Sequence, residues 1–247
     1  MGATGPEVNG AKRALRVGVD ATAWANRRGF GRFARGMLSR LVELDGEVEY
    51  VFYVDAPGAA AGALPPRAEV RRVSLARPPG LAEDGAGRTV ADVLRLSAAA
   101  RADRLDAFLF PSYHTYFPVL GVPSVVGVHD TTPQDLPDLL LRNRRAAVLF
   151  RLKARVALRQ ARIVFTVSEA SRRAVGRCFG IDTGSIAVVG CAPDAVFRPR
   201  SDAEVASARD ALGLDSRDPL FVYAAGINPH KNVETLVDAF ARVRPNG

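Results

Sequence analysis

The chain has 247 residues, of which 48% are hydrophobic, and it carries a formal net charge of +8 at pH 7. This composition is that of a globular protein with an ample core, and it excludes a disordered or fibrous chain. The positive charge attracts anionic partners at long range, but no helix-turn-helix, zinc-finger or RNA-stacking pattern accompanies it, so we expect no nucleic-acid partner.

The chain carries few signals for a location. Two cysteines, Cys178 and Cys191, fit neither a disulfide framework nor a metal-ligand spacing. No apolar run approaches the roughly 20 residues of a membrane span, and residues 1–10 lack the basic start and apolar core of a signal peptide. We therefore expect a cytoplasmic protein, with residues 1–13, which are small and polar, disordered.

The first predicted element is a short strand over residues 15–20, with Asp20 at its carboxyl end. Open α/β sheets bind ligands at that edge. The loop 24–32 follows and leads into a helix whose apolar positions keep a 3.6-residue period. In this loop, Gly29 and Gly31 allow backbone N–H groups to approach a ligand beside a helix N-terminus, although a flexible turn explains them equally.

The middle of the chain predicts strands over 48–54, 69–75 and 106–110 and a helix over 89–102. The aromatic loop 113–117 follows the last of these strands, so Tyr113 lies past its carboxyl edge. Loops at this edge often carry function, and packing against the next strand is an equally good explanation.

The strand predicted over residues 124–128 ends in His129 and Asp130. This position puts an imidazole at the ligand edge of a parallel sheet, where it can hydrogen-bond a polyhydroxylated substrate, with a carboxylate adjacent. A histidine that merely caps a strand is the structural alternative.

A helix predicted over residues 143–161 is rich in arginine. The spacing places one set of arginines on a single face: Arg144, Arg151, Arg155, Arg159 and Arg162. A basic face of this kind can lie against anionic lipid headgroups, and a solvated helix face is the alternative.

The last part of the chain predicts a buried strand over 221–225, a break at Gly226 and Pro229, and a helix from Val233. Lys231 lies in the loop between them, beside a helix N-terminus whose free N–H groups and dipole favour a phosphate, and Asn232 or its neighbour can cap the first turn. An ordinary β-α connection with a solvated lysine is the alternative.

Several of these segments resemble the group 1 family of retaining glycosyltransferases with the GT-B fold, and the likeness extends over about residues 15–244. Four segments carry it: Gly29-Phe-Gly-Arg-Phe33, the Val-x-x-x-His-Asp motif that ends at Asp130, the run from Thr166 to Pro199, and Phe221–Phe240 with its Lys-Asn-Val.

The resemblance implies an α/β fold with a Rossmann-like parallel sheet. Residues 14–199 correspond to the N-terminal, acceptor-side domain, and residues 200–247 to the start of the donor-nucleotide domain. Because a single β-α unit cannot bury both of its faces, we expect a truncated second Rossmann-like domain. The family's Glu-x7-Glu motif is not among the 247 residues, so we expect the chain to be inactive or very weak alone.

The implied reaction transfers a sugar from a nucleoside-diphosphate sugar to a hydroxyl acceptor with retention, as in glycan, glycolipid or polysaccharide biosynthesis. The implied catalytic residues are His129, beside the donor sugar, and Lys231, on the diphosphate. Donor phosphates are assigned to Gly29, Gly31, Gly226, Lys231 and Asn232, and the sugar or acceptor side to His129, Asp130, Asp20 and Tyr113. No metal or other cofactor is expected.

One departure concerns the second cation on the diphosphate. Many members carry an arginine five residues before the lysine, where this chain has Gly226, and whether His230 replaces that charge is open. Two other functions are compatible with the sequence. A non-catalytic domain that holds a nucleotide or a partner would bind without turnover, and a GT-B sugar-nucleotide epimerase is disfavoured by the His-Asp and Lys-Asn motifs.

Overall fold

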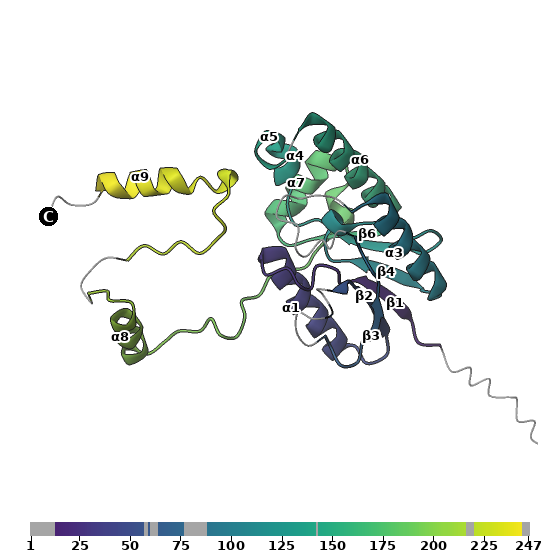
Figure 1. Ribbon diagram of the computed structural model, residues 1–247, viewed down its shortest axis with the longest axis horizontal. Coiled ribbons are helices and arrows are strands. Elements are labelled where there is room, and N and C mark those ends of the chain that lie inside the picture. The colour runs from purple at the N-terminus through teal and green to yellow at the C-terminus, as the bar shows by residue number, and fades with distance from the viewer. Residues whose placement is uncertain are drawn as a thin grey trace, which may run out of the picture. The chain divides into compact units, whose positions relative to one another are not determined.

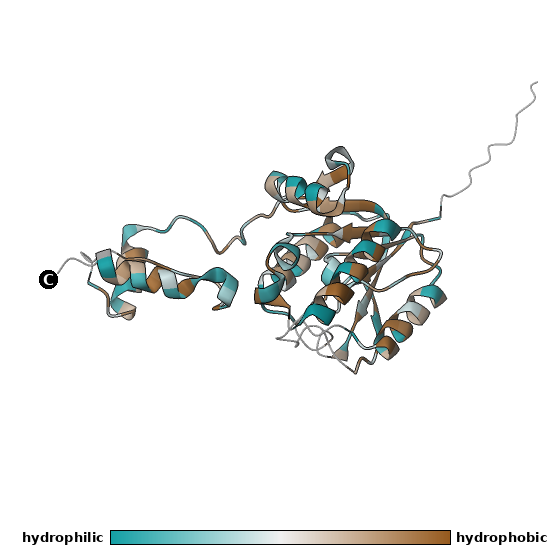
Figure 2. Ribbon diagram, turned by 90° about the horizontal axis from the view of Figure 1, so that it is seen from above, coloured by the Kyte–Doolittle hydropathy of each residue, from teal (hydrophilic) through white to brown (hydrophobic). Residues whose placement is uncertain are grey.

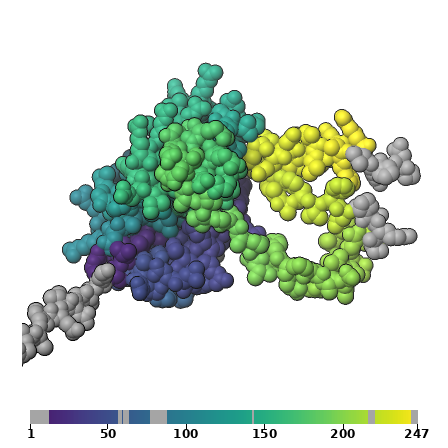
Figure 3. Space-filling view, turned by 180° about the vertical axis from the view of Figure 1, so that it is seen from behind, coloured from purple at the N-terminus to yellow at the C-terminus, as the bar shows by residue number. Residues whose placement is uncertain are grey.

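The computed structural model describes residues 13–56, 59, 64–76, 88–141, 143–215 and 220–243. The chain divides into two compact units, Met1–Gly190 and Cys191–Gly247, and each is described by itself. In the space-filling view the first unit forms one continuous mass (Figure 3). Residues 1–12, for which the sequence predicts disorder, lie outside the described residues.

The first unit is built on one seven-stranded sheet in which all neighbours are parallel (Figure 1). The strand order is β3-β2-β1-β4-β5-β6-β7, so the order reverses between β1 and β4. This sheet confirms the predicted α/β, Rossmann-like fold. The strands are β1 (Arg16–Asp20), β2 (Glu49–Val54), β3 (Glu69–Arg72), β4 (Ala107–Phe110), β5 (Ser124–Gly127), β6 (Ala161–Thr166) and β7 (Ile186–Val188).

Helices connect the strands and pack on both faces of the sheet (Figure 1). The α-helices of this unit are α1 (Gly29–Leu44), α3 (Val90–Ala102), α4 (Thr132–Asp135), α5 (Pro137–Leu140), α6 (Arg144–Gln160) and α7 (Glu169–Phe179). Two short 3-10 helices complete it, η1 (Tyr113–Thr115) and η2 (Thr183–Ser185).

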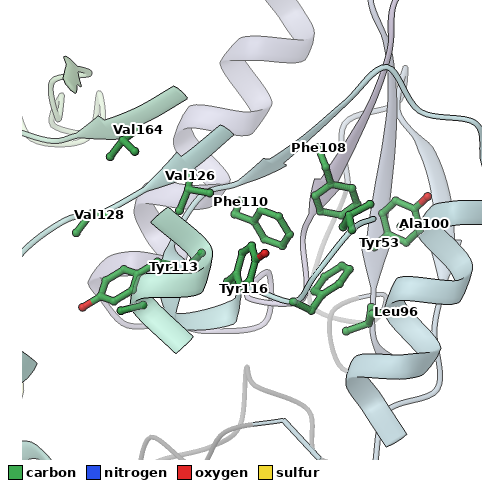
Figure 4. Packing of buried hydrophobic residues seen from close by; sticks show 14 of the residues in the cluster. Tyr53, Leu96, Ala100, Phe108, Phe110, Tyr113, Tyr116, Val126, Val128 and Val164 are labelled. Carbon is green, nitrogen blue, oxygen red and sulfur yellow. The ribbon is translucent and has the colours of Figure 1, made fainter. Parts of the chain in front are cut away.

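The alternation of side chains along β2 shows how the sheet separates two hydrophobic clusters. Val51 and Tyr53 point into a cluster with α3, α6 and α7, which Figure 4 shows around Phe108. Phe52 and Val54 point to the other face, where α1 packs. Both faces are therefore buried, as parallel sheets require, and Figure 2 shows hydrophobic colouring along the strands.

Local signals explain where several elements begin and end. Thr89 and Asp92 form a capping box at the start of α3, and Ser168 accepts a hydrogen bond from the Ser171 N–H at the start of α7. The strand β3 is shorter than predicted and ends at Arg72. After it, the Val73 N–H donates to the Val54 carbonyl, where β2 itself ends, so the ladder has no further partner.

The prediction of a strand over residues 221–225 is wrong. These residues form no ladder with any segment that the structure describes, and Phe221 and Val222 are 71% and 78% exposed. A lone extended segment has no partner for its N–H and C=O groups, so apolar composition alone does not make a strand. The Phe221 ring instead contacts Phe240, with ring centroids 5.4 Å apart.

The described elements of the second unit are helical: α8 (Asp202–Ala211), the 3-10 helix η3 (Pro229–Lys231) and α9 (Val233–Val243). The sequence analysis missed α8. Its signal is the capping box between Ser201 and Glu204, in which each residue's side chain accepts from the other's backbone N–H.

The two glycines expected in a ligand-binding loop lie instead in the first turn of α1, which begins at Gly29. Gly31 is needed for packing: a Cβ at this position would lie 2.1 Å from the Asn26 carbonyl oxygen. Gly29 meets nothing within 4 Å. The close approach of Asn26 to the helix thus accounts for Gly31 without a ligand.

Replacing Gly31 should therefore destabilise the first unit. We expect Gly31→Ala to lower the free energy of unfolding by about 1–3 kcal/mol, because backbone atoms must move to admit the methyl group. Gly36→Ala, on the same helix with nothing within 4 Å of its Cβ, is the control and should raise it by up to about 1 kcal/mol. Urea denaturation of the two variants measures the difference, and equal stabilities would contradict the packing argument.

Candidate functional site

The candidate site lies at the carboxyl edge of the sheet, where the strand order reverses between β1 and β4. Open α/β sheets bind ligands in the crevice at this point. Asp20 ends β1, Pro111 follows β4, and His129 follows β5 by two residues. The fold thus brings three separate loops to one edge.

Asp20 is fully buried and forms an ion pair with Arg88. The Arg88 guanidinium donates to the two carboxylate oxygens at 3.1 and 3.2 Å, and the Thr22 N–H and hydroxyl donate to the same carboxylate at 3.1 and 2.6 Å. Arg88 also donates to the Thr115 carbonyl and lies 5.1 Å from the Phe117 ring centroid. An acceptor-side role for Asp20 stays a prediction, and its carboxylate already has these partners.

His129 is half-buried and held in one orientation. Its Nε2 lies 2.9 Å from the Pro111 carbonyl oxygen, and its ring packs edge-on against Phe33 with centroids 4.6 Å apart. A carbonyl can only accept, so Nε2 carries the proton and Nδ1 keeps a lone pair. Burial lowers the pKa of His129, although the Pro111 hydrogen bond and Asp130 oppose the shift. The imidazole is therefore neutral near pH 7, with Nδ1 available as an acceptor.

Asp130 is exposed next to this histidine, and one of its carboxylate oxygens accepts the Thr132 N–H at 2.9 Å. This contact closes the turn into α4. Tyr113, in contrast, is only 1% exposed, and its ring belongs to the core cluster of Figure 4. Its hydroxyl lies 3.4 Å from the Gln134 side-chain oxygen, and burial raises the pKa of the phenol. Contacts of Asp130 and Tyr113 with a sugar or acceptor stay predictions.

Two cations at this edge were missed by the sequence analysis, Arg88 and Lys153. Lys153 projects from α6, and its Nζ donates to the His114 carbonyl at 2.5 Å. Burial lowers the pKa of Lys153 to about 8; Arg88 adds to the shift and Asp20 opposes it. One signal was available: lysine occurs only at Lys12, Lys153 and Lys231 in an otherwise arginine-rich chain. Nothing in the sequence pointed to Arg88, because its partner Asp20 is distant along the chain.

The predicted phosphate-binding residues of the second unit cluster around η3. Lys231 is exposed at the end of this turn, directly before α9. Gly226 is exposed as well, and a Cβ there would meet only Asn228. Asn232 adopts a left-handed conformation with φ of 50°, and its side-chain oxygen accepts the Thr235 hydroxyl at 2.7 Å rather than a backbone N–H. Among the contacts of the described residues, the Asn232 side chain thus caps no backbone N–H of α9, and phosphate binding at this helix start stays a prediction.

A hollow of about 430 Å³ lies at the opposite, amino edge of the sheet, lined among others by Arg16, Glu49 and Glu69. Arg16 donates to both of these carboxylates, so the charges there compensate each other. Parallel sheets of this type bind ligands at the carboxyl edge. We therefore assign the site to the edge with His129 and Lys153.

The described residues contain neither a metal cluster nor a membrane-spanning helix. Among them, no group of three or more His, Cys, Asp or Glu side chains is arranged to hold a metal ion. None of the helices that the structure describes is long and apolar enough to cross a bilayer.

Comparison with known proteins identifies relatives. A family model described as Glycosyltransferase Family 4 matches residues 27–195, a segment that contains Arg88, His129 and Lys153. No curated protein matches the sequence at a significant level.

Solved structures with the same fold include Anabaena Alr3699/HepE in complex with UDP-glucose, with 16% identity and a TM-score of 0.64. The match covers 94% of this chain and 58% of that chain. The complex of the same protein with UDP and glucose gives 15% identity, a TM-score of 0.59, and coverage of 94% and 59%. The chain therefore spans less than two thirds of that protein's length, and at this identity the likeness shows the fold.

The environment of Lys153 generates a prediction about its titration. We expect its amine to lose its proton near pH 8, below the ordinary lysine value of about 10.4, because burial and Arg88 disfavour the charged form. Reductive methylation with isotope-labelled formaldehyde gives each lysine its own NMR signal, and Lys153→Arg assigns the signal that disappears. A midpoint for Lys153 at the ordinary value would contradict the assigned environment.

Proposed function

The chain belongs to glycosyltransferase family 4, and we propose that it takes part in transferring a sugar from a nucleoside-diphosphate donor to a hydroxyl acceptor with retention of the anomeric configuration, as the group 1 enzymes do. Such a transfer would serve the assembly of a glycan, glycolipid or polysaccharide. The observation that carries the proposal is the neutral imidazole of His129, fixed at the carboxyl edge of the sheet with Nδ1 available as an acceptor.

In this proposal His129 contacts the donor sugar. Sugar hydroxyls are donors, and a neutral imidazole whose Nε2–H is engaged by Pro111 accepts one at Nδ1. The T-shaped contact with Phe33 prevents ring rotation, so the acceptor is preorganised. Asp130, Asp20 and Tyr113 surround the sugar or the acceptor in the same proposal.

Lys231 and the N-terminus of α9 supply the charge for the leaving diphosphate. A nucleoside diphosphate develops negative charge as the glycosidic bond breaks, and a lysine beside free backbone N–H groups stabilises it. Gly226 and Asn232 shape the same turn, so that the backbone approaches the phosphates. Lysine and the helix terminus perform this task without a metal, and no cofactor enters the proposal.

The proposed location is the cytoplasm. Cys178 and Cys191 are both free and exposed, as thiols in a reducing compartment are. Peripheral contact with the inner face of a membrane is a separate proposal that does not depend on sugar transfer.

Activity assays test the proposed class of function. Incubation with UDP-glucose and a panel of hydroxyl acceptors should release UDP, and the anomeric proton of the product reports retention by NMR. Binding of UDP without any release in the presence of acceptors favours the second candidate, a nucleotide-binding domain without turnover. We expect the turnover of the chain alone to be very weak, so the assay compares UDP release with and without acceptor over long incubations, and binding is measured separately.

Lys231 should set the affinity for the diphosphate. We expect Lys231→Ala to weaken UDP binding by roughly 10- to 100-fold, because a charge-assisted hydrogen bond is lost. Arg242→Ala is the matched control: it removes one exposed positive charge from the far end of α9, the helix that follows Lys231. Calorimetric titration with UDP separates the two, and equal effects of both variants would remove Lys231 from the phosphate site.

His129 should act on the sugar and not on the phosphates. We expect His129→Ala to leave the affinity for UDP nearly unchanged and to reduce the affinity for UDP-glucose by about 3- to 10-fold, the contribution of one neutral hydrogen bond. Titrations with both ligands give the difference. A parallel loss for UDP would move His129 out of the sugar subsite.

A further inference from the structure

The outward face of α6 combines positive charge with exposed apolar side chains. The helix is 17 residues long and contains no acidic residue. Most of its exposed residues are of two kinds, arginine and aliphatic. These residues are here called the α6 face: Arg144, Arg145, Val148, Leu149, Arg151, Leu152, Arg155 and Arg159. Val148, Leu149 and Leu152 are 57–66% exposed, so apolar surface faces solvent where the helix is most basic.

The arginines of the α6 face differ from several others in the first unit that are paired with carboxylates. None of the arginines of the α6 face forms an ion pair or hydrogen bond with a residue that the structure describes, whereas Arg16, Arg71 and Arg88 are all paired with carboxylates. Asn143 caps the helix, and Ala154 and Ala157 bury its inner side against the sheet. The helix is therefore capped and packed without any contribution from these arginines. Arg162, expected on the same face, lies in β6 instead, because the helix ends at Gln160.

We propose that the α6 face docks on the surface of an anionic lipid bilayer. Guanidinium groups pair with lipid phosphates in bidentate geometry, and aliphatic side chains between them enter the boundary between headgroups and acyl chains. Nucleic acid would satisfy the arginines but leave the leucines in water. A membrane interface is the partner that satisfies both kinds of side chain at once.

The α6 face also lies next to the candidate site. Leu149 and Lys153 are four residues apart and therefore adjacent on the helix surface. Lys153 reaches the His114 carbonyl at the carboxyl edge of the sheet. A bilayer in contact with Leu149 thus comes close to the site, and an acceptor anchored in that bilayer can reach it. This last step rests on the proposed function, whereas docking itself does not.

Vesicle binding tests the proposal with the chain as it is and without donor or acceptor. The chain should float with phosphatidylcholine vesicles that contain phosphatidylglycerol and stay behind with pure phosphatidylcholine, and salt should weaken the binding. We expect the triple variant R151Q/R155Q/R159Q to bind on the order of 100-fold more weakly, since each arginine near an anionic surface contributes about fivefold.

A second triple variant, R101Q/R173Q/R177Q, controls for net charge, since it removes three exposed arginines from α3 and α7. It should keep most of the binding. A third variant, V148S/L149S/L152S, removes only the apolar part and should lower the affinity about tenfold or more. Circular dichroism and thermal unfolding verify that all three fold.

Three outcomes would overturn docking: equal binding to both kinds of vesicle, equal losses for the two arginine variants, or parental binding by the serine variant. Self-association through the α6 face, seen as a dimer that the serine variant abolishes while vesicles do not bind, would also overturn it. Vesicle binding together with absent sugar transfer would instead count against the proposed function and leave the docking surface intact.

Discussion

The buried ion pair between Asp20 and Arg88 holds the carboxyl edge of the sheet together. Removing one partner of such a pair costs about 3–5 kcal/mol, because the other charge is left without compensation in the interior. Through Thr115, Arg88 fixes the 3-10 turn η1, and through Asp20 it fixes the end of β1. The same turn presents the His114 carbonyl to Lys153. The position of Lys153 therefore depends on the Asp20–Arg88 ion pair, which is buried.

The sequence predicted most of the first unit because its signals are local. Apolar runs marked the strands, the spacing of arginines marked one face of α6, and the strand-terminal position of His129 indicated its edge. The Asp20–Arg88 pair was out of reach, since it joins residues 68 positions apart. The prediction of a strand over 221–225 was wrong because it rested on local apolar composition. A strand also needs a neighbouring strand to pair with, and composition does not supply one.

The second unit shows that a turn can form without the strand before it. Pro229 begins the 3-10 turn, the Lys231 N–H donates to the Asn228 carbonyl at 2.8 Å, and Asn232 takes the left-handed conformation directly before α9. These features need only residues within a few positions of Lys231. The conformation of this loop is thus encoded locally, whereas its attachment to a sheet is not.

The contrast between Lys153 and the arginines of the same helix separates two tasks. A guanidinium keeps its charge at every physiological pH and is weakly hydrated, which suits contact with phosphates at a surface. An ammonium is compact and changes its pKa when it is buried, and the pKa of Lys153 is lowered mainly by burial, with a smaller contribution from Arg88. The α6 face therefore presents guanidinium groups, while the pKa of the neighbouring Lys153 is lowered to about 8. One helix thereby carries both the proposed docking surface and a cation of the candidate site.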